Sequence, residues 1–576
     1  MYIETVPNRS SPPAILLREG WREGKTVRKR TLANLSHWPA EKIEALRRVL
    51  KGEALVAPED VFTIERSWPH GHVEAVLAMA RKLGLERLIA AKRSRQRDLV
   101  VAMIVERLVH PCSKLATTRL WHTTTLAQAL AVDGADADDL YAAMDWLLAR
   151  QERIETKLAR RHLKDGGRAL YDVTSSYYEG RSCPLMRFGY SRDGKRGKTQ
   201  VVYGVLAGDG GCPVAVSVYP GNTGDPATLG DQVATLKGRF GLERVVLVGD
   251  RGMLTQARID DLRRHPGLGW ISALRSPAIR ALLEDGAVQP SLFDERNLAE
   301  IAAPGFPGER LIVCFNPLLA DQRARKREDL LAATEKQLDK LVRQVEQRRK
   351  TPLSAAEIGQ KVGRIKGRFK VAKHFRLVIA DGAFRYQRDT GTIAAEARLD
   401  GLYVIRTSEP RDRLSPENAV RAYKDLGQVE QAFRCLKGLD IRVRPIRHRH
   451  EHRVRAHIFL CLLAYYLEWH LRKALAPLLF DDETREADRK TRDPVAPAKP
   501  SPAARRKKSH RQTDDGLPVH SFETLLAELG TRCRHRCRLN ADPKAPTVER
   551  VTEPTPIQGR VLELIEAFPV PGTAHA

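Results

Sequence analysis

Long apolar stretches are absent from the sequence. The nearest, HIFLCLLAYYLEWHL at 457–471, is shorter than the roughly 18 apolar residues of a membrane-spanning helix and carries Glu468. The first residues, MYIETVPNRSSPPAILL, also lack the basic stretch followed by an apolar stretch that marks a secretory signal. We therefore expect neither a membrane span nor secretion, and we expect the protein to work inside the cell.

Cysteines are few and scattered, which argues against a disulfide framework. The eight stand at positions 112, 183, 212, 314, 435, 461, 533 and 537. The last two flank His535 in CRHRC, which resembles half of a metal site, but no second half is evident. We therefore expect a reducing compartment and no zinc at CRHRC.

The chain has fewer acidic residues than basic ones. The chain has 71 Asp and Glu against 98 Lys and Arg, a formal net charge of +27. Such an excess indicates a polyanionic partner, most simply nucleic acid, although a basic surface can also serve solubility alone. The hydrophobic share of 42% is that of a globular protein, and 576 residues are enough for several domains.

Periodicity and composition divide the chain into segments. Two short strands around a Glu23-Gly24-Lys25 turn are predicted within 14–36, and apolar residues at three- and four-residue spacing then predict helices. The expected parts are a small β segment (1–40), a helical region that is either a DNA-binding or a packing domain (41–165), a core in two parts (166–275 and 409–480), an insertion domain (276–408), a disordered linker (481–517) and a C-terminal tail (518–576).

The core segment has the pattern of an α/β fold. ALYDVTSSYY, TQVVYGVLAG and CPVAVSVYPG read as three strands with short connections, which suits an antiparallel meander. A helix at DPATLGDQVATLKGRFGL, the strand RVVLVGD, the helix LTQARIDDLRR and the strand GWISALR follow. The order β-β-β-α-β-α-β is the ribonuclease-H-like arrangement. An α+β insertion with a long charged helix at 321–349 interrupts it, and helices return after about residue 415.

Three acidic residues stand where such a fold can bring them together. Asp172 lies in the first strand, Asp250 ends the fourth, and Glu430 lies in a late helix. Mg²⁺ prefers hard oxygen ligands, and two such ions about 4 Å apart clamp the attacking and departing oxygens of a phosphodiester. The pattern predicts a two-metal site. Taken singly, Asp250 also suits a turn or helix cap, and Glu430 suits a helix surface.

Basic and polar residues accompany these acids. Tyr423, Glu430 and Lys437 are spaced by seven and seven, so on one helix they share a face. If Glu430 faces a metal and a phosphate, Tyr423 and Lys437 face DNA as well; the alternative is a polar helix edge that holds them by chance. Arg192 and Lys198, together with the neighbouring Lys195 and Arg196, are predicted to contact phosphates.

The combined motifs resemble the DDE transposases of bacterial insertion sequences, in the superfamily with the signature Y-(2)-R-(3)-E-(6)-K. Tyr423, Leu426, Glu430 and Lys437 match its spacing, with Leu426 in place of the usual Arg. Arg434, one helical turn beyond Glu430, is a candidate to replace that Arg. The segments YDVTSSYYEG, RFGYSRDGKRGKTQVVYGVLA, VYPGNTGD and VVLVGDRGML also resemble the family, over roughly 165–475, and 14–36 fits the same subgroup.

The resemblance implies a function. Asp172, Asp250 and Glu430 would form a triad holding two Mg²⁺ or Mn²⁺ ions. Water would attack at the transposon end and free a 3′-OH, which then attacks target DNA. The implied partners are terminal inverted repeats, target DNA and a second copy of the chain, in the cytoplasm at the bacterial nucleoid. The alternatives are a nuclease of the same fold without strand transfer, and a DNA-binding relic with a dead site.

Overall fold

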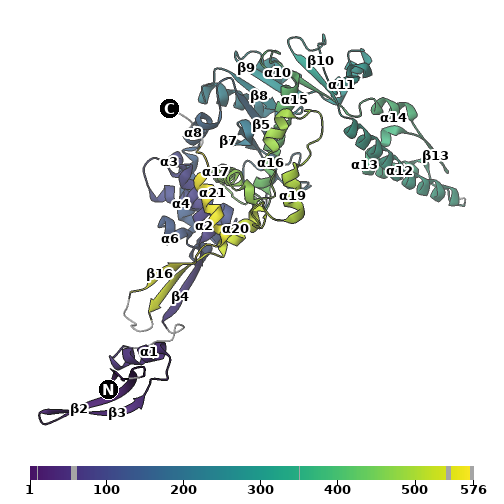
Figure 1. Ribbon diagram of the computed structural model, residues 1–576. Coiled ribbons are helices and arrows are strands. Elements are labelled where there is room, and N and C mark those ends of the chain that lie inside the picture. The colour runs from purple at the N-terminus through teal and green to yellow at the C-terminus, as the bar shows by residue number, and fades with distance from the viewer. Residues whose placement is uncertain (10, 54–60, 349, 540–545, 571–576) are drawn as a thin grey trace. The chain divides into compact units, whose positions relative to one another are not determined.

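The computed structural model describes residues 1–9, 11–53, 61–348, 350–539 and 546–570. It consists of two compact units, of which the first combines Met1–Trp68 with Cys533–Glu553 and the second combines Pro69–Arg532 with Pro554–Ala576 (Figure 1). Each unit is therefore assembled from segments that are distant in sequence.

The first unit contains two small three-stranded sheets. Strands β1 (Tyr2–Val6), β2 (Ala14–Glu23) and β3 (Thr26–Asn34) form one, followed by helix α1 (Ala40–Leu50). The predicted hairpin is confirmed, with Gly24 at a φ of 63° in its turn, where a side chain would be strained. The second sheet has the order β16-β15-β4, from Val548–Val551, Cys533–Leu539 and Phe62–Pro69. The expectation that 41–165 is helical throughout is wrong at β4, because its partner lies in the C-terminal tail, beyond the reach of local periodicity.

The second unit begins with a group of helices. Ser94 accepts from the backbone N of Arg97 and starts α4, and a capping box between Asp136 and Asp139 starts α7. Almost every residue of α4 between Arg97 and Leu108 is buried. The helices are α2 (Gly71–Lys82), α3 (Leu85–Ile89), α4 (Arg95–Val109), α5 (Lys114–Leu120), α6 (Leu126–Leu130), α7 (Ala137–Leu148) and α8 (Gln151–His162). They share one continuous hydrophobic core with the sheet that follows.

A mixed sheet of eight strands organises the rest of this unit, which confirms an α/β fold. Its order is β10-β11-β14-β9-β8-β5-β6-β7. The strands are β5 (Arg168–Tyr177), β6 (Gln200–Ala207), β7 (Pro213–Pro220), β8 (Val245–Gly249), β9 (Leu268–Ala273), β10 (Leu298–Ile301), β11 (Arg310–Phe315) and β14 (Leu402–Thr407). Strands β5, β6 and β7 form the predicted antiparallel meander, whereas β8 runs parallel to β5 and β9 parallel to β8. In the sequence, α9 (Leu229–Val233) lies between β7 and β8, α10 (Gln256–Leu262) between β8 and β9, and α11 (Ser276–Glu284) between β9 and β10.

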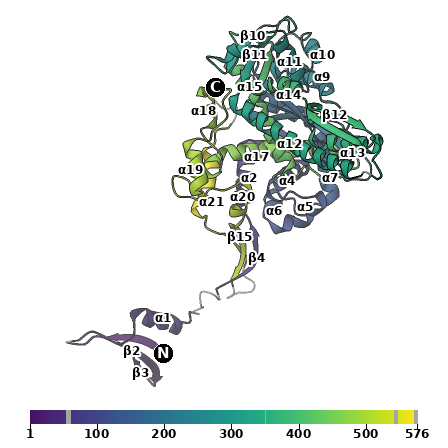
Figure 2. The same ribbon diagram turned by 90° about the vertical axis from the view of Figure 1, so that its right-hand side faces the viewer.

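The segment 276–408, expected to form one insertion domain, contributes to three hydrophobic clusters. Its strands β10, β11 and β14 extend the main sheet, because Ile405 of β14 pairs with Ala273 of β9. A separate core forms between α12 (Pro317–Gln347), α13 (Ala355–Phe369), β12 (Phe375–Ala380) and β13 (Ala383–Arg388), with α14 (Thr390–Ala397) beside it (Figure 2). An apolar stripe of α12 is buried there, at Leu331, Leu338, Leu341 and Val345.

Two consecutive helices and one long helix complete the core. They are α15 (Pro416–Lys424), α16 (Leu426–Lys437) and α17 (Glu451–Ala474). Helix α16 packs against β5. The break between α15 and α16 falls at Asp425, whose carboxylate accepts from Arg168 at 3.2 Å and pairs with Arg489. Helix α17 is buried along most of its length, and no helix in the described ranges is long and apolar enough to cross a membrane.

The segment 481–517 differs from the disordered linker expected from its composition. It contains α18 (Arg485–Thr491) and α19 (Pro502–His510). Its cations make specific tertiary contacts: Arg489 pairs with Asp425, and Lys507 Nζ donates to the carbonyl of Ala476 at 3.0 Å. Composition shows the charges of this segment but not their distant partners. The last helices are α20 (Phe522–Gly530) and α21 (Pro556–Ala567).

Candidate active site

Asp172 and Asp250 lie on neighbouring parallel strands. Tyr171 of β5 is in register with Gly249 of β8, so the next residue of each strand is one of the two acids. Asp172 is half-buried inside β5, and Asp250 is exposed directly after β8 ends. The parallel pairing therefore places both carboxylates at the same level of the sheet.

Glu430 joins them from α16. Its side chain is exposed on the helix that packs against β5. The pKa of Asp172 is raised to about 7, chiefly by burial and in addition by the negative charges of Asp250 and Glu430. The backbone N–H of Val173, which donates to Asp172 Oδ1 at 2.7 Å, acts in the opposite direction. Asp250 and Glu430 thus each lie close enough to Asp172 to influence it electrostatically.

This donor set suits divalent cations. Three carboxylates offer only hard oxygen ligands, which is the chemistry that Mg²⁺ selects. The charges of Asp250 and Glu430 disfavour ionisation of Asp172, and a bound cation would relieve that repulsion. Asp172, Asp250 and Glu430 are therefore the residues that would hold a metal.

Tyr423 contacts an acid of this group. Its hydroxyl donates to Asp250 Oδ1 at 3.3 Å, and burial, followed by the charge of Asp250, raises the pKa of the phenol. The other oxygen of Asp250 accepts from the backbone N of Gly252 at 3.2 Å. Asp250 therefore does cap the turn after β8, as its local sequence allowed, while its first oxygen faces Tyr423. A contact of Tyr423 with DNA stays a prediction.

Lys437 is paired with an acid that sequence reasoning missed. Its Nζ donates to Asp193 Oδ1 at 2.9 Å, and Arg444 also pairs with this carboxylate. The side chain of Asp193 is 1% exposed, and its Oδ2 accepts from the backbone N of Tyr177 at 3.0 Å. Burial lowers the pKa of Lys437, an effect that Asp193 opposes. The available signal was that Asp193 is the one acid in the basic segment RFGYSRDGKRGK.

The other predicted DNA contacts lie on accessible side chains. Arg192 pairs with Asp225 and lies near enough to Asp172 to lower its pKa. Lys198 Nζ donates to Glu179 Oε1 at 2.8 Å. Arg434 is exposed and donates to Gln431 Oε1 at 2.6 and 2.9 Å. Leu426, at the position of the signature Arg, is buried.

Comparisons with known proteins give the family. Residues 170–467, just over half of the chain, match the family model of the transposase DDE domain, and residues 3–60 match that of the N-terminal domain of IS1634 family transposases. Among curated proteins no match was found. Among solved structures, a cryo-EM structure of the piggyBac transposase synaptic complex with hairpin DNA aligns over 80% of this chain and 76% of that chain, at 10% identity and a TM-score of 0.31. The chain therefore belongs to the family of transposases with a DDE domain and is a DNA-cutting and DNA-joining enzyme.

Proposed function

We propose that this transposase mobilises an insertion sequence through a site formed by Asp172, Asp250 and Glu430. The supporting observation is geometric: Asp172 and Asp250 directly follow paired residues of two parallel strands, and Glu430 lies on a helix packed against the first of them. The surrounding strands, in the order β7-β6-β5-β8-β9, form the proposed ribonuclease-H-like core. The proposed substrates are the inverted repeats at the element's ends and target DNA in the bacterial nucleoid.

The reaction has two phosphoryl transfers. In the first, a water oxygen attacks the phosphorus at the transposon end, and the bond to the departing oxygen breaks to free a 3′-OH. In the second, this 3′-OH attacks a phosphorus in target DNA, so that one phosphodiester forms while another breaks. The protons released from water and from the attacking hydroxyl pass to solvent, and each departing 3′ oxygen takes up a proton from solvent.

The side chains of this chain would place the reacting groups. Asp172, Asp250 and Glu430 would hold two Mg²⁺ or Mn²⁺ ions, which when bound activate the nucleophile and stabilise the leaving oxygen. Tyr423 would fix the orientation of Asp250 through their hydrogen bond. Lys437 would hold the 187–198 segment beside the site through Asp193.

Phosphate contacts would come from cations around the carboxylates. Arg192, Lys198 and Arg434 are accessible, and their present partners lie at or near the protein surface, so a DNA phosphate can compete for them. Tyr423 and Lys437 would lie beside the same DNA. Because two transposon ends must be joined to one target, we further propose that the active form is a homodimer that holds the paired ends.

A magnesium-dependent assay on inverted-repeat DNA and a target plasmid tests the proposal. The unaltered protein should nick the ends and yield joined products, whereas Asp172→Asn, Asp250→Asn and Glu430→Gln should each lose at least about a thousandfold in rate. Asp412→Asn is the matched control, because Asp412 is an exposed acid in a loop.

The other outcomes point to the rival functions. Cleavage without joined products would indicate a nuclease, and DNA binding without cleavage would indicate a relic. If the three triad variants cleave like the control variant, the assignment of the site is wrong.

A further inference from the structure

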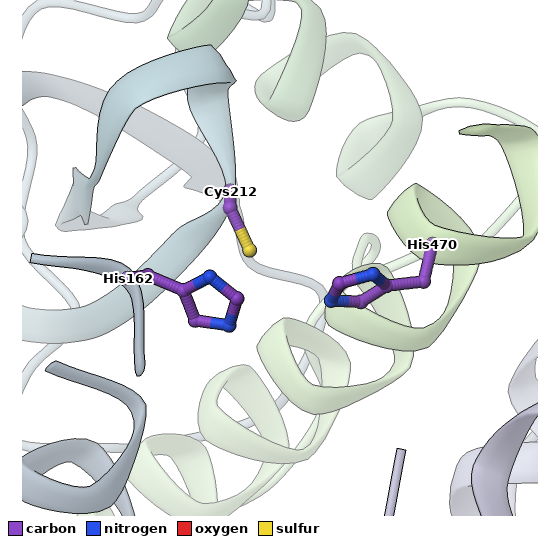
Figure 3. A group of neighbouring side chains, drawn as sticks. All are labelled: His162, Cys212 and His470. Atoms are coloured by element: carbon purple, nitrogen blue, oxygen red, sulfur yellow. The ribbon is translucent and has the colours of Figure 1, made fainter. Parts of the chain in front are cut away.

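A second group of metal-binding side chains lies among residues that the carboxylate site does not use. His162, Cys212 and His470 each offer a donor atom, and these atoms all lie within 4.8 Å of one another. Figure 3 shows the three side chains pointing toward one another. His162 is the last residue of α8, Cys212 directly precedes β7, and His470 lies in α17. Their separation in the sequence leaves no spacing motif, so sequence reasoning could not find them.

The group is buried and its hydrogen bonding is incomplete. Cys212 and His470 are each 1% exposed. Neither ring nitrogen of His470 has a hydrogen-bond partner within the described part of the chain. A neutral imidazole has one N–H donor and one lone pair that can accept. Burying such an atom without a hydrogen-bond partner lowers the stability of the fold by about 1–3 kcal/mol. A metal ion bound to one nitrogen would remove part of that cost.

His162 is oriented as a ligand would be. Its Nε2 lies 3.1 Å from the hydroxyl of Tyr466, which leaves the other ring nitrogen for a metal. Metal-binding histidines commonly use their second nitrogen in this way. Burial lowers the pKa of His162 to about 4 and that of His470 to about 3, so both rings are neutral at pH 7 and hold a free lone pair.

Another cluster of side chains that could bind a metal already holds a cation of the protein itself. Cys435, Asp440 and Glu468 also bring their donor atoms within 4.8 Å. There, however, Arg472 pairs with Glu468 at 2.6 Å and with Asp440 at 3.3 Å, so a cation already occupies the place of a metal.

The nearby cations at the histidine group are Arg161 and Lys473, and both disfavour a further cation there. Burial raises the pKa of the Cys212 thiol well above its usual range, and this is opposed only in part by the charge of Lys473. Its Nζ is partly balanced by Glu486 at 3.7 Å. A bound Zn²⁺ would favour loss of the thiol proton, and the thiolate would then add a negative charge to the group.

We propose that His162, Cys212 and His470 bind one Zn²⁺, with a water molecule as the fourth ligand. Two imidazoles and one thiolate form a ligand set that selects Zn²⁺ over Mg²⁺ and Ca²⁺. The ion would tie α8, the β6–β7 connection and α17 together. Its binding free energy would then add to the stability of the joint between the helices and the sheet. This zinc would stabilise the fold and is separate from the ions of the carboxylate site.

The full chain, loaded with zinc and then dialysed against metal-free buffer, tests the proposal. Elemental analysis should find one zinc per chain. In protein loaded with Co²⁺ instead, a thiolate-to-cobalt charge-transfer band should appear. Cys212→Ser should abolish that band and His470→Gln should reduce metal content, whereas Cys314→Ser, which alters a buried thiol of β11, should change neither. Retained zinc equal to the buffer background, or equal cobalt bands in Cys212→Ser and Cys314→Ser, would overturn the proposal.

Alkylation of the unaltered protein keeps the test valid should a variant misfold. Zinc should slow the labelling of Cys212, as mapped by mass spectrometry, and a chelator should restore it, while the labelling of Cys314 stays the same in both conditions. Labelling of Cys212 that is indifferent to zinc and chelator would equally rule out a zinc–thiolate bond.

Discussion

Tyr423 donates its hydroxyl hydrogen bond to Oδ1 of Asp250, across 3.3 Å and from a helix to the end of a strand. The tyrosine of the transposase signature is therefore joined to one of the proposed metal ligands. In Tyr423→Phe the ring remains and only this bond is lost. We expect a cost of about 1 kcal/mol in transition-state stabilisation, or roughly fivefold in the single-turnover cleavage rate.

The affinity for inverted-repeat DNA separates this role from a direct DNA contact. If Tyr423 acts by orienting Asp250, Tyr423→Phe should bind the DNA as tightly as the unaltered protein in a filter-binding assay. If a loss of affinity for the DNA accounts for the whole decrease in cleavage rate, the hydroxyl of Tyr423 contacts the DNA instead.

The carboxylate cluster should destabilise the protein when no metal is bound. Asp172 is half-buried and feels the charges of Asp250 and Glu430. In metal-free buffer at pH 8, Asp172→Asn should therefore raise the free energy of unfolding by about 1–2 kcal/mol, although it abolishes cleavage. Added Mg²⁺ should raise the melting temperature of the unaltered protein more than that of the variant. Asp412→Asn should show neither effect, and a destabilised Asp172→Asn protein would contradict the argument.

Lys437 should act through Asp193. Removing the lysine leaves the buried carboxylate with Arg444 as its remaining cation. We expect Lys437→Met to lower the free energy of unfolding by about 2 kcal/mol, which is less than we would expect if Lys437 were the only cation paired with Asp193. The substitution should also make the 187–198 segment more sensitive to limited proteolysis. Adding Asp193→Asn to this variant should restore part of the stability. Additive effects of the two substitutions would mean that the pair is not coupled and that Lys437 serves the DNA independently.

The sequence predicts those features that depend on local pattern. The meander β5–β7, the strand β8, which ends directly before Asp250, and the buried stripe of α12 all agree with residue periodicity. Asp172 and Asp250 could be expected to converge because their two strands are neighbours in the predicted sheet. Glu430 followed from a signature spacing, but the expectation that Tyr423 shares one helix with it is wrong, because a break at Asp425 places Tyr423 on α15 and Glu430 on α16.

The remaining features depend on contacts between distant residues. Strand β4 forms only because β15 pairs with it, and β14 lies in the main sheet because β9 offers it an edge. Asp193 has no local pattern that marks it as buried, and its burial depends on Lys437 and Arg444. Such partners are set by tertiary structure, which single-sequence periodicity does not encode.

The burial of Lys114 in the helical region should make the free energy of unfolding depend on pH. This lysine begins α5 and is 4% exposed. Burial, followed by the charge of Arg107, lowers its pKa from 10.5 to about 7. The titratable groups that act on it or feel its charge are Glu106, Arg107, Cys112, Cys461, His448 and His457.

The sign of the effect follows from proton linkage. Between pH 7 and 10.5 the unfolded chain keeps the proton of Lys114, whereas the folded chain has released it. Stability therefore rises with pH across this window, by at most about 1.4 kcal/mol per pH unit, and the full penalty of the buried charge applies below pH 7. In Lys114→Met this contribution is absent. The variant should exceed the unaltered protein in free energy of unfolding by about 2–4 kcal/mol at pH 7, and the gap should narrow toward pH 10.

Urea unfolding at pH 7, 8, 9 and 10, followed by tryptophan fluorescence, measures that gap. Lys164→Met is the control, because Lys164 is exposed, and it should follow the unaltered protein at every pH. The other groups near Lys114 titrate in both proteins, so their contribution largely cancels in the difference. A gap between Lys114→Met and the unaltered protein that stays constant from pH 7 to 10 would mean that the folded protein keeps Lys114 protonated, and that the helical core accommodates its charge.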